Sequence, residues 1–157
     1  MRPASTIFVW DNIAIKFRLA ELLEQVAIIG VLVAISIPIF TSQLEKSRDA
    51  VTLSNIRAAY AQAQTAYLTG SNDGDDVVYT AKVAASGSVA AADAKVQVKH
   101  VEAKGQKGTI DNFDQLPFAT KASELNADGN MGGTPGKYTI TFTYDENGIS
   151  KVEAVKE

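Results

Sequence analysis

The feature that most constrains the fold is an uncharged apolar stretch near the start of the chain. The fifteen residues from Val26 to Phe40 carry no charge and are rich in isoleucine and valine. A helix that is apolar all round is too hydrophobic to lie on the surface of a globular domain. The longer segment Phe17–Phe40, which contains this stretch, therefore needs lipid or other helices around it.

The helical pattern continues to Leu68 and becomes amphipathic after Thr41. Apolar side chains recur there at spacings of three and four, at Leu53, Ile56, Tyr60, Ala63 and Tyr67. The opposite side of this helix carries charged residues, namely Glu45, Lys46, Arg48, Asp49 and Arg57. Gly70 is the expected C-terminal cap.

The expected length of this helix has a structural consequence. As one helix, Phe17–Leu68 is about 78 Å long at about 1.5 Å per residue. A compact domain made from the remaining residues has a radius of gyration of about 13 Å. We therefore expect the apolar half of the helix to project, covered by a bilayer, by copies of itself, or by each in turn.

The C-terminal residues carry the clearest strand signal. Tyr138, Ile140, Phe142 and Tyr144 alternate with threonines, which predicts a half-buried strand. Residues 145–148 read as a turn, and residues 149–155 as the returning strand. This hairpin is expected to pack its aromatic face on the amphipathic helix, and the fold class is α+β with a small antiparallel sheet.

The middle of the chain is less regular. The alternation in residues 96–101 predicts a strand, on one face of which His100 is expected. Small polar residues from Ala84 to Ala94 suggest an exposed loop. Residues 109–136 are expected to be irregular, and residues 70–157 as a whole to form the head that packs on the helix.

Composition gives little support for catalysis or nucleic-acid binding. The net charge is −3, there is no cysteine, and His100 is the one histidine. Neither a catalytic triad nor a phosphate-binding glycine loop can be assembled. We expect no enzyme activity, cofactor, metal or nucleic-acid partner. The acidic clusters at residues 73–76 and 126–130 are read as solvated turns, with a calcium loop as the weaker alternative.

The order of residues in the apolar helix resembles a known family. It is similar to the N-terminal segment of type IV pilins and type II secretion pseudopilins, on Phe17, Leu19, Glu21, Leu22, Leu23, the run 26–35 with Gly30, and Pro38. The resemblance implies a long helix whose apolar half projects and whose amphipathic half, residues 41–69, packs on a sheet. It also implies that residues 1–16 are a leader.

The resemblance assigns processing to Lys16 and Phe17. A prepilin peptidase cuts before the phenylalanine on the cytoplasmic face, and the new N-terminus is then methylated. Lys16 stands where the family has glycine, Arg18 replaces a small hydroxyl residue, and Glu24 and Gln25 replace aliphatic residues.

Three further residues are singled out in the apolar helix. The resemblance implies that Glu21 pairs in the filament with the amine of Phe17 on a neighbouring subunit; the alternative is an interfacial residue with no partner. Pro38 cannot donate to the carbonyl of Ala34, so the helix should kink or loosen there. With Gly30 as a second weak point, the segment between them resembles one that melts on assembly; a simple membrane-helix kink is the alternative.

The implied function is that of a pilus subunit. The chain is expected to cross the cytoplasmic membrane once with its N-terminus inside, and then to join an extracellular filament of identical subunits that serves adhesion or motility. An assembly ATPase and a membrane platform are the implied partners. The alternatives are a pseudopilin of a secretion or DNA-uptake apparatus, a single-pass anchored binding module, and a secretory signal sequence.

Overall fold

The computed structural model describes the backbone of residues 7–83, 89–127 and 129–157, and the side chains of residues 18–81, 94–127 and 129–157. Its elements are, in chain order, helix α1 (Ile7–Thr69), strand β1 (Val77–Val83), strand β2 (Val89–Ala103), the short 3-10 helices η1 (Phe113–Gln115), η2 (Ala119–Lys121) and η3 (Ser123–Asn126), strand β3 (Gly136–Asp145) and strand β4 (Gly148–Lys156). The fold class is α+β, as expected.

The chain divides into two compact units, residues 1–43 and residues 44–157. The first contains the apolar part of α1, and the second contains the amphipathic part of α1 with the whole sheet. We call the second unit the head. The sequence predicts a leader at residues 1–16 and a helix that begins at Phe17. In the structure α1 already begins at Ile7, inside the expected leader.

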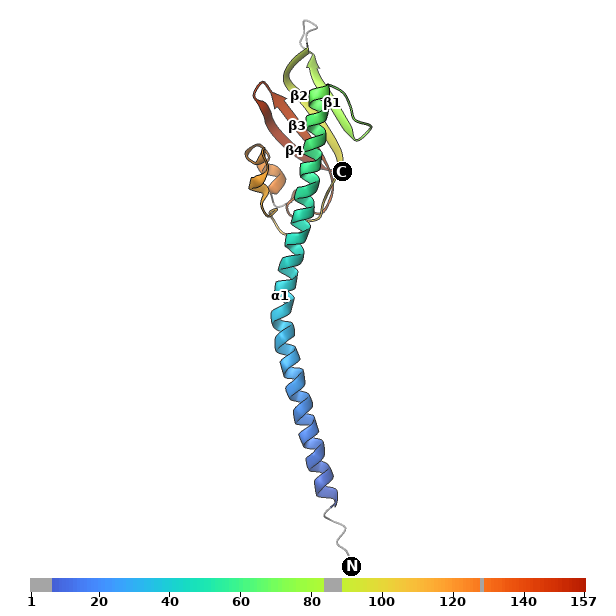
Figure 1. Ribbon diagram of the computed structural model, residues 1–157, viewed down its shortest axis with the longest axis vertical. Coiled ribbons are helices and arrows are strands. Elements are labelled where there is room, and N and C mark those ends of the chain that lie inside the picture. The colour runs from blue at the N-terminus through green and yellow to red at the C-terminus, as the bar shows by residue number, and fades with distance from the viewer. Residues whose placement is uncertain (1–6, 84–88, 128) are drawn as a thin grey trace, which may run out of the picture. The chain divides into compact units, whose positions relative to one another are not determined.

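The four strands form one antiparallel sheet in the order β1-β2-β3-β4. The C-terminal part of α1, green in Figure 1, lies across it. The β3–β4 hairpin is confirmed: its turn joins Asp145 to Gly148, and alternate β3 residues from Tyr138 to Tyr144 are buried. The period of two seen in the sequence thus directs one face of the hairpin into the core.

The helix stripe and the aromatic face of β3 meet as expected. Ile56 and Ala63 are fully buried, and the ring of Tyr67 stacks on Tyr144 with centroids 4.1 Å apart and planes 8° apart. Tyr60 packs beside Phe142 at 6.2 Å. Offset aromatic pairs of this kind add about 0.5–1.5 kcal/mol each beyond the burial of their surface.

Helix α1 ends at Thr69 for the expected reason. Gly70 has φ of 64°, a left-handed conformation that glycine adopts without steric penalty. Its N–H donates to the carbonyl of Ala66 at 2.9 Å. This contact satisfies one of the carbonyls that the last turn leaves free.

The prediction of an exposed loop over residues 84–94 is wrong for its second half, and residues 84–88 lie outside the described part. Strand β2 begins at Val89, which pairs with Val83 of β1, and Ala94 is fully buried opposite Tyr144. The sequence suggests a loop there because small and polar residues are typical of loops. In the fold, residue 94 is a buried core position whose cross-strand partner is Tyr144.

The segment between β2 and β3 is irregular, as expected, but it supplies a substantial part of the core. Its three short 3-10 helices and their connections bury seven apolar side chains: Ile110, Phe113, Leu116, Phe118, Ala122, Leu125 and Met131. The ring of Phe118 lies 5.0 Å from Tyr60 and 5.5 Å, edge-on, from Phe142. This segment thus closes one side of the helix–sheet interface.

Candidate functional site

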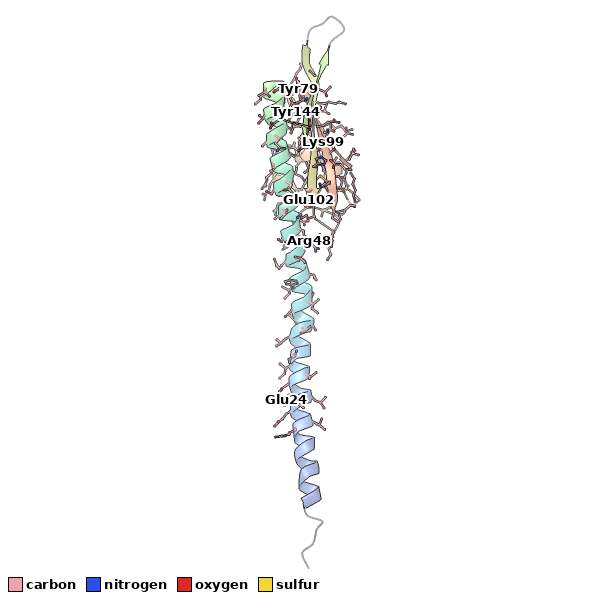
Figure 2. The ribbon with its side chains drawn as sticks, turned by 90° about the vertical axis from the view of Figure 1, so that its right-hand side faces the viewer. Glu24, Arg48, Tyr79, Lys99, Glu102 and Tyr144 are labelled. Carbon is pink, nitrogen blue, oxygen red and sulfur yellow. The ribbon has the colours of Figure 1, made fainter. Side chains whose placement is uncertain are left out.

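The first candidate site is the surface of the apolar part of α1. Every residue from Arg18 to Leu44 is exposed, and the large apolar side chains of residues 26–40 are between 48% and 69% exposed. Figure 2 shows the side chains of this part of α1, Glu24 among them, pointing outward from the helix. Within the described residues α1 is the one helix long and apolar enough to cross a membrane. Such a surface requires a non-aqueous environment.

Gly30 and Pro38 both lie inside α1, and the helix continues through each of them. A Cβ atom at Gly30 would meet no atom within 4 Å, so this position is an open notch on the helix surface. Two hydroxyl groups near Pro38 bond to helix carbonyls: Ser36 Oγ donates to Leu32 O at 2.7 Å, and Thr41 Oγ1 donates to Pro38 O at 3.1 Å. The helix is thus continuous at both residues, and the expected kink or loosening at Pro38 stays a prediction.

The charged residues of the apolar unit lie at its N-terminal side. Arg18, Glu21 and Glu24 are all exposed, and Glu21 and Glu24 share one side of the helix because they are three residues apart. The side chains of Lys16 and Phe17 lie outside the described part of the chain. The expected pairing between Glu21 and the Phe17 amine stays a prediction.

The second candidate site is a set of α1 side chains that hold the segment after β2. The Glu45 carboxylate accepts the backbone N–H groups of Gln106 and Lys107. Thr52 Oγ1 accepts the N–H of Lys104 at 2.9 Å. The sequence pattern predicts that Glu45 and Asp49 lie on the charged side of the helix, opposite the core-facing stripe. That prediction is wrong for both residues, because both side chains face this segment.

Two further contacts extend this set of α1 side chains, which we call the clamp. Asn55 Nδ2 donates to the carbonyl oxygen of Glu102 at 2.8 Å, and Arg48 Nη1 donates to Gln106 Oε1 at 3.0 Å. The clamp therefore runs over three turns of α1. It binds the Glu102 carbonyl at the end of β2 and the N–H groups of three residues that follow β2, and so satisfies backbone groups that would otherwise need another partner.

The two carboxylates of the clamp differ in their electrostatics. Backbone hydrogen bonds, chiefly from Gln106, lower the pKa of Glu45. Desolvation raises the pKa of Asp49, which is 3% exposed. Asp49 Oδ2 accepts a long hydrogen bond of 3.4 Å from the N–H of Asp111, whereas Oδ1 has no partner among the described atoms.

Asp49 packs closely against the backbone at Gly105. A Cβ atom at Gly105 would lie 2.9 Å from Asp49 Oδ1 and 2.9 Å from the carbonyl oxygen of Gly132. Only glycine allows the chain to pass this close. Asp49 Oδ1 and the Gly132 carbonyl oxygen therefore both line the space beside Gly105, where no side chain fits.

His100 lies at an irregularity in β2 rather than on a regular strand face. The register of β2 against β3 shifts between Val98 and Val101, and His100 has φ of 60°. Its backbone N–H donates to Glu157 Oε1 at 2.8 Å, and its Nδ1 lies 2.7 Å from Glu157 Oε2. These bonds, the backbone one first, lower the pKa of Glu157.

The acidic clusters show structural roles where they are described. Asn126 Oδ1 accepts the N–H of Ile110, and Asn130 Oδ1 accepts the N–H of Met131 at 2.9 Å; Asp128 lies outside the described residues. Residues 73–76 are exposed. In the residues that the structure describes, no group of three or more His, Cys, Asp or Glu side chains is placed to hold a metal ion.

No family model matches the chain, and the searches of curated proteins and of solved structures likewise return no match. The class of protein rests on architecture alone. A long helix with an apolar N-terminal part, packed through its later part on an antiparallel sheet, is a pilin-like architecture.

Proposed function

We propose that the chain is a structural, non-catalytic subunit of an extracellular type IV pilus. It waits in the cytoplasmic membrane as a prepilin, is processed before Phe17, and enters a helical filament of identical subunits. The observation that carries the proposal is the full exposure of the apolar part of α1. A surface apolar on all sides needs lipid before assembly and neighbouring helices afterwards.

The energetics of this exchange define the further partners. Lipid tails and packed apolar helices are similarly non-polar, so transfer between them has no large hydrophobic driving force. Extraction from the membrane therefore needs external energy. In our proposal an assembly ATPase provides it through a platform protein, after a prepilin peptidase has removed the leader.

In the filament, Glu21 pairs with the free amine of Phe17 on the next subunit. Burying either charge alone is unfavourable, and pairing offsets much of that cost. The segment between Gly30 and Pro38 melts during packing, where Pro38 already leaves one carbonyl without its helical donor. Both roles belong to the assembled state.

The nearest alternative is a pseudopilin of a secretion or DNA-uptake apparatus, which shares the same helix. A single-pass anchored binding module and a secretory signal sequence are alternatives from other classes. The pilus is preferred to the anchor because Glu21, Gly30 and Pro38 occur together in one apolar helix at the spacing of the pilin family. It is preferred to the secretory signal because no small-residue cleavage site follows Phe40.

The decisive experiment determines the mature N-terminus and images surface fibres in the native host. A methylated Phe17 in long filaments supports the pilus, and a methylated Phe17 without long filaments supports the pseudopilin. An intact leader supports the anchor, and a start beyond Phe40 supports the secretory signal. Lys16→Gly is the matched variant for processing, and it should be cut faster than the wild type.

A further inference from the structure

The exposed part of α1 contains an uncharged interval longer than the apolar stretch itself. No charged residue lies between Glu24 and Glu45, so the interval is Gln25–Leu44. Its twenty residues extend about 30 Å along a helix at about 1.5 Å per residue. This length equals the thickness of the hydrocarbon core of a bilayer, about 30 Å.

The polar side chains inside this interval are compatible with lipid. Ser36, near its centre, donates its hydroxyl to Leu32 O, and Thr41 donates its hydroxyl to Pro38 O. These bonds satisfy both hydroxyl donors within the helix, as a medium without water requires. The remaining polar residues, Gln25, Ser42 and Gln43, lie near the two ends, where their heads can reach the interface.

Contacts within the head fix the C-terminal end of the interval. Every residue from Arg18 to Leu44 is exposed, and Glu45 is the first that is not. The Glu45 carboxylate is bound by two backbone N–H groups and by Arg48 at 3.3 Å. Moving Glu45 into lipid would break these bonds and bury a charge, so Leu44 is the last residue free to enter the bilayer.

The N-terminal end follows from the position of Glu24. A span of equal length that ended at Phe40 would begin at Glu21, and Glu24 would then lie about 4.5 Å inside the hydrocarbon at about 1.5 Å per residue. A charge costs about 2.5–3.5 kcal/mol at the centre of the bilayer and less towards its edge. A span of the same length that ends at Leu44 begins at Gln25 and leaves Glu24 outside the hydrocarbon, so it avoids this cost. We call the choice of the two end residues the frame of the span.

We infer that the membrane-spanning segment of this protein is Gln25–Leu44, bounded by Glu24 at one interface and Glu45 at the other. The residues from Phe17 to Glu24 then form a continuation of the helix that lies in the polar interface, a lipid-headgroup surface. The inference rests on the membrane residence in the proposed function and not on filament formation. In this arrangement Glu21 already lies outside the hydrocarbon core, so pairing with the Phe17 amine of a neighbouring subunit does not require it to leave lipid tails first.

Single-cysteine labelling tests this frame, because the chain has no cysteine of its own. The full-length variants Leu23→Cys, Ser36→Cys, Ser42→Cys and Lys46→Cys are expressed in a host without pilus assembly machinery. A membrane-impermeant maleimide is applied to sealed cells, to inverted membrane vesicles, and to detergent-solubilised membranes. Leu23→Cys should be labelled only from the cytoplasmic side and Lys46→Cys only from the opposite side. The cysteines at residues 36 and 42 should remain unlabelled from either side until detergent is added.

The residue 23 and residue 42 variants separate the competing frames. Protection at residue 23 together with labelling at residue 42 in sealed membranes overturns the inference in favour of a span that ends at Phe40. Labelling at residue 36 without detergent overturns both the inference and the membrane residence. If the labelling pattern is as expected but the native host forms no filaments, the result supports the span Gln25–Leu44 and counts only against the pilus function. As a second measurement, Ser42→Glu should reduce the fraction that resists carbonate extraction, whereas Leu23→Glu should not.

Discussion

Replacing Asp49 by asparagine should stabilise the head at neutral pH. Asp49 Oδ1 is buried without a hydrogen-bond partner among the described atoms. Asparagine has nearly the same shape and no charge, and its amide oxygen can still accept the N–H of Asp111. The substitution therefore removes a buried charge and keeps the one hydrogen bond that the side chain accepts.

The expected magnitude follows from the structure. A buried unsatisfied group costs about 1–3 kcal/mol, and we take about 1–2 kcal/mol because Oδ2 keeps one long hydrogen bond. Unfolding the head, Leu44–Glu157, has an entropy of about 0.24 kcal/mol/K at about 2.1 cal/mol/K per residue. A change of about 1 kcal/mol in the free energy of unfolding then shifts Tm by about 4 °C. Asp49→Asn should therefore raise Tm by about 4–8 °C near pH 7.

The gain should depend on pH with a defined sign. Burial raises the pKa of Asp49 above its ordinary value of 3.8. The stability that the wild-type group contributes is therefore fully present below that ordinary value, and it is lost as pH rises through the folded value. Asparagine does not titrate, so the advantage of the variant should be smaller near pH 4 than near pH 7.

The assay is thermal unfolding of the full-length protein in detergent, followed by near-ultraviolet circular dichroism at both pH values. Asp114→Asn is the matched control, because Asp114 is exposed and its loss removes the same charge. The reasoning is refuted if Asp49→Asn lowers Tm at neutral pH. It is equally refuted if the gain has the same size at acid pH, or if the control gains as much.

Four further predictions concern single side chains. Glu21→Ala should leave membrane insertion unchanged and impair filament assembly, as measured by membrane fractionation and electron microscopy of fibres. Tyr144→Phe should raise stability by about 1 kcal/mol, because the buried hydroxyl has no partner among the described atoms. Tyr138→Phe should lower stability by about 1 kcal/mol, because it loses the 2.8 Å hydrogen bond to Thr134 O; thermal melts compare the two. Glu45→Ala should cost about 1.5–3 kcal/mol near pH 7, since two N–H groups lose a charged acceptor. Its effect should shrink as pH falls, because the pKa of Glu45 is lowered in the fold and its contribution is lost on protonation.

Each of these predictions can fail on its own. Normal filaments made from Glu21→Ala alone would count against the pairing with the Phe17 amine. Equal Tm changes in the two tyrosine variants would show that the hydrogen bond of Tyr138 does not distinguish them. An effect of Glu45→Ala that is as large in acid as at neutral pH would show that its charge is not what holds the loop.

The sequence alone determined the parts of the fold that depend on local periodicity. The β3–β4 hairpin follows from alternation with a period of two, and the turn before Gly148 lies within the same short stretch. The apolar interval and the end of α1 just before Gly70 could likewise be predicted, because hydropathy and a left-handed cap involve only neighbouring residues. The stripe of α1 that contacts β3 was predicted for the same reason.

Only the tertiary structure decided where the charged side chains of α1 point and which segments complete the core. Glu45 and Asp49 bind backbone groups about sixty residues later in the chain, and His100 meets Glu157 across the sheet. A helical pattern shows that such side chains lie off the apolar stripe, but it cannot show what the rest of the chain brings to that side. Burial of Asp49, the pairing of Val89 in β2 and the buried side chains of residues 113–131 all depend on contacts between distant segments, which local patterns do not encode.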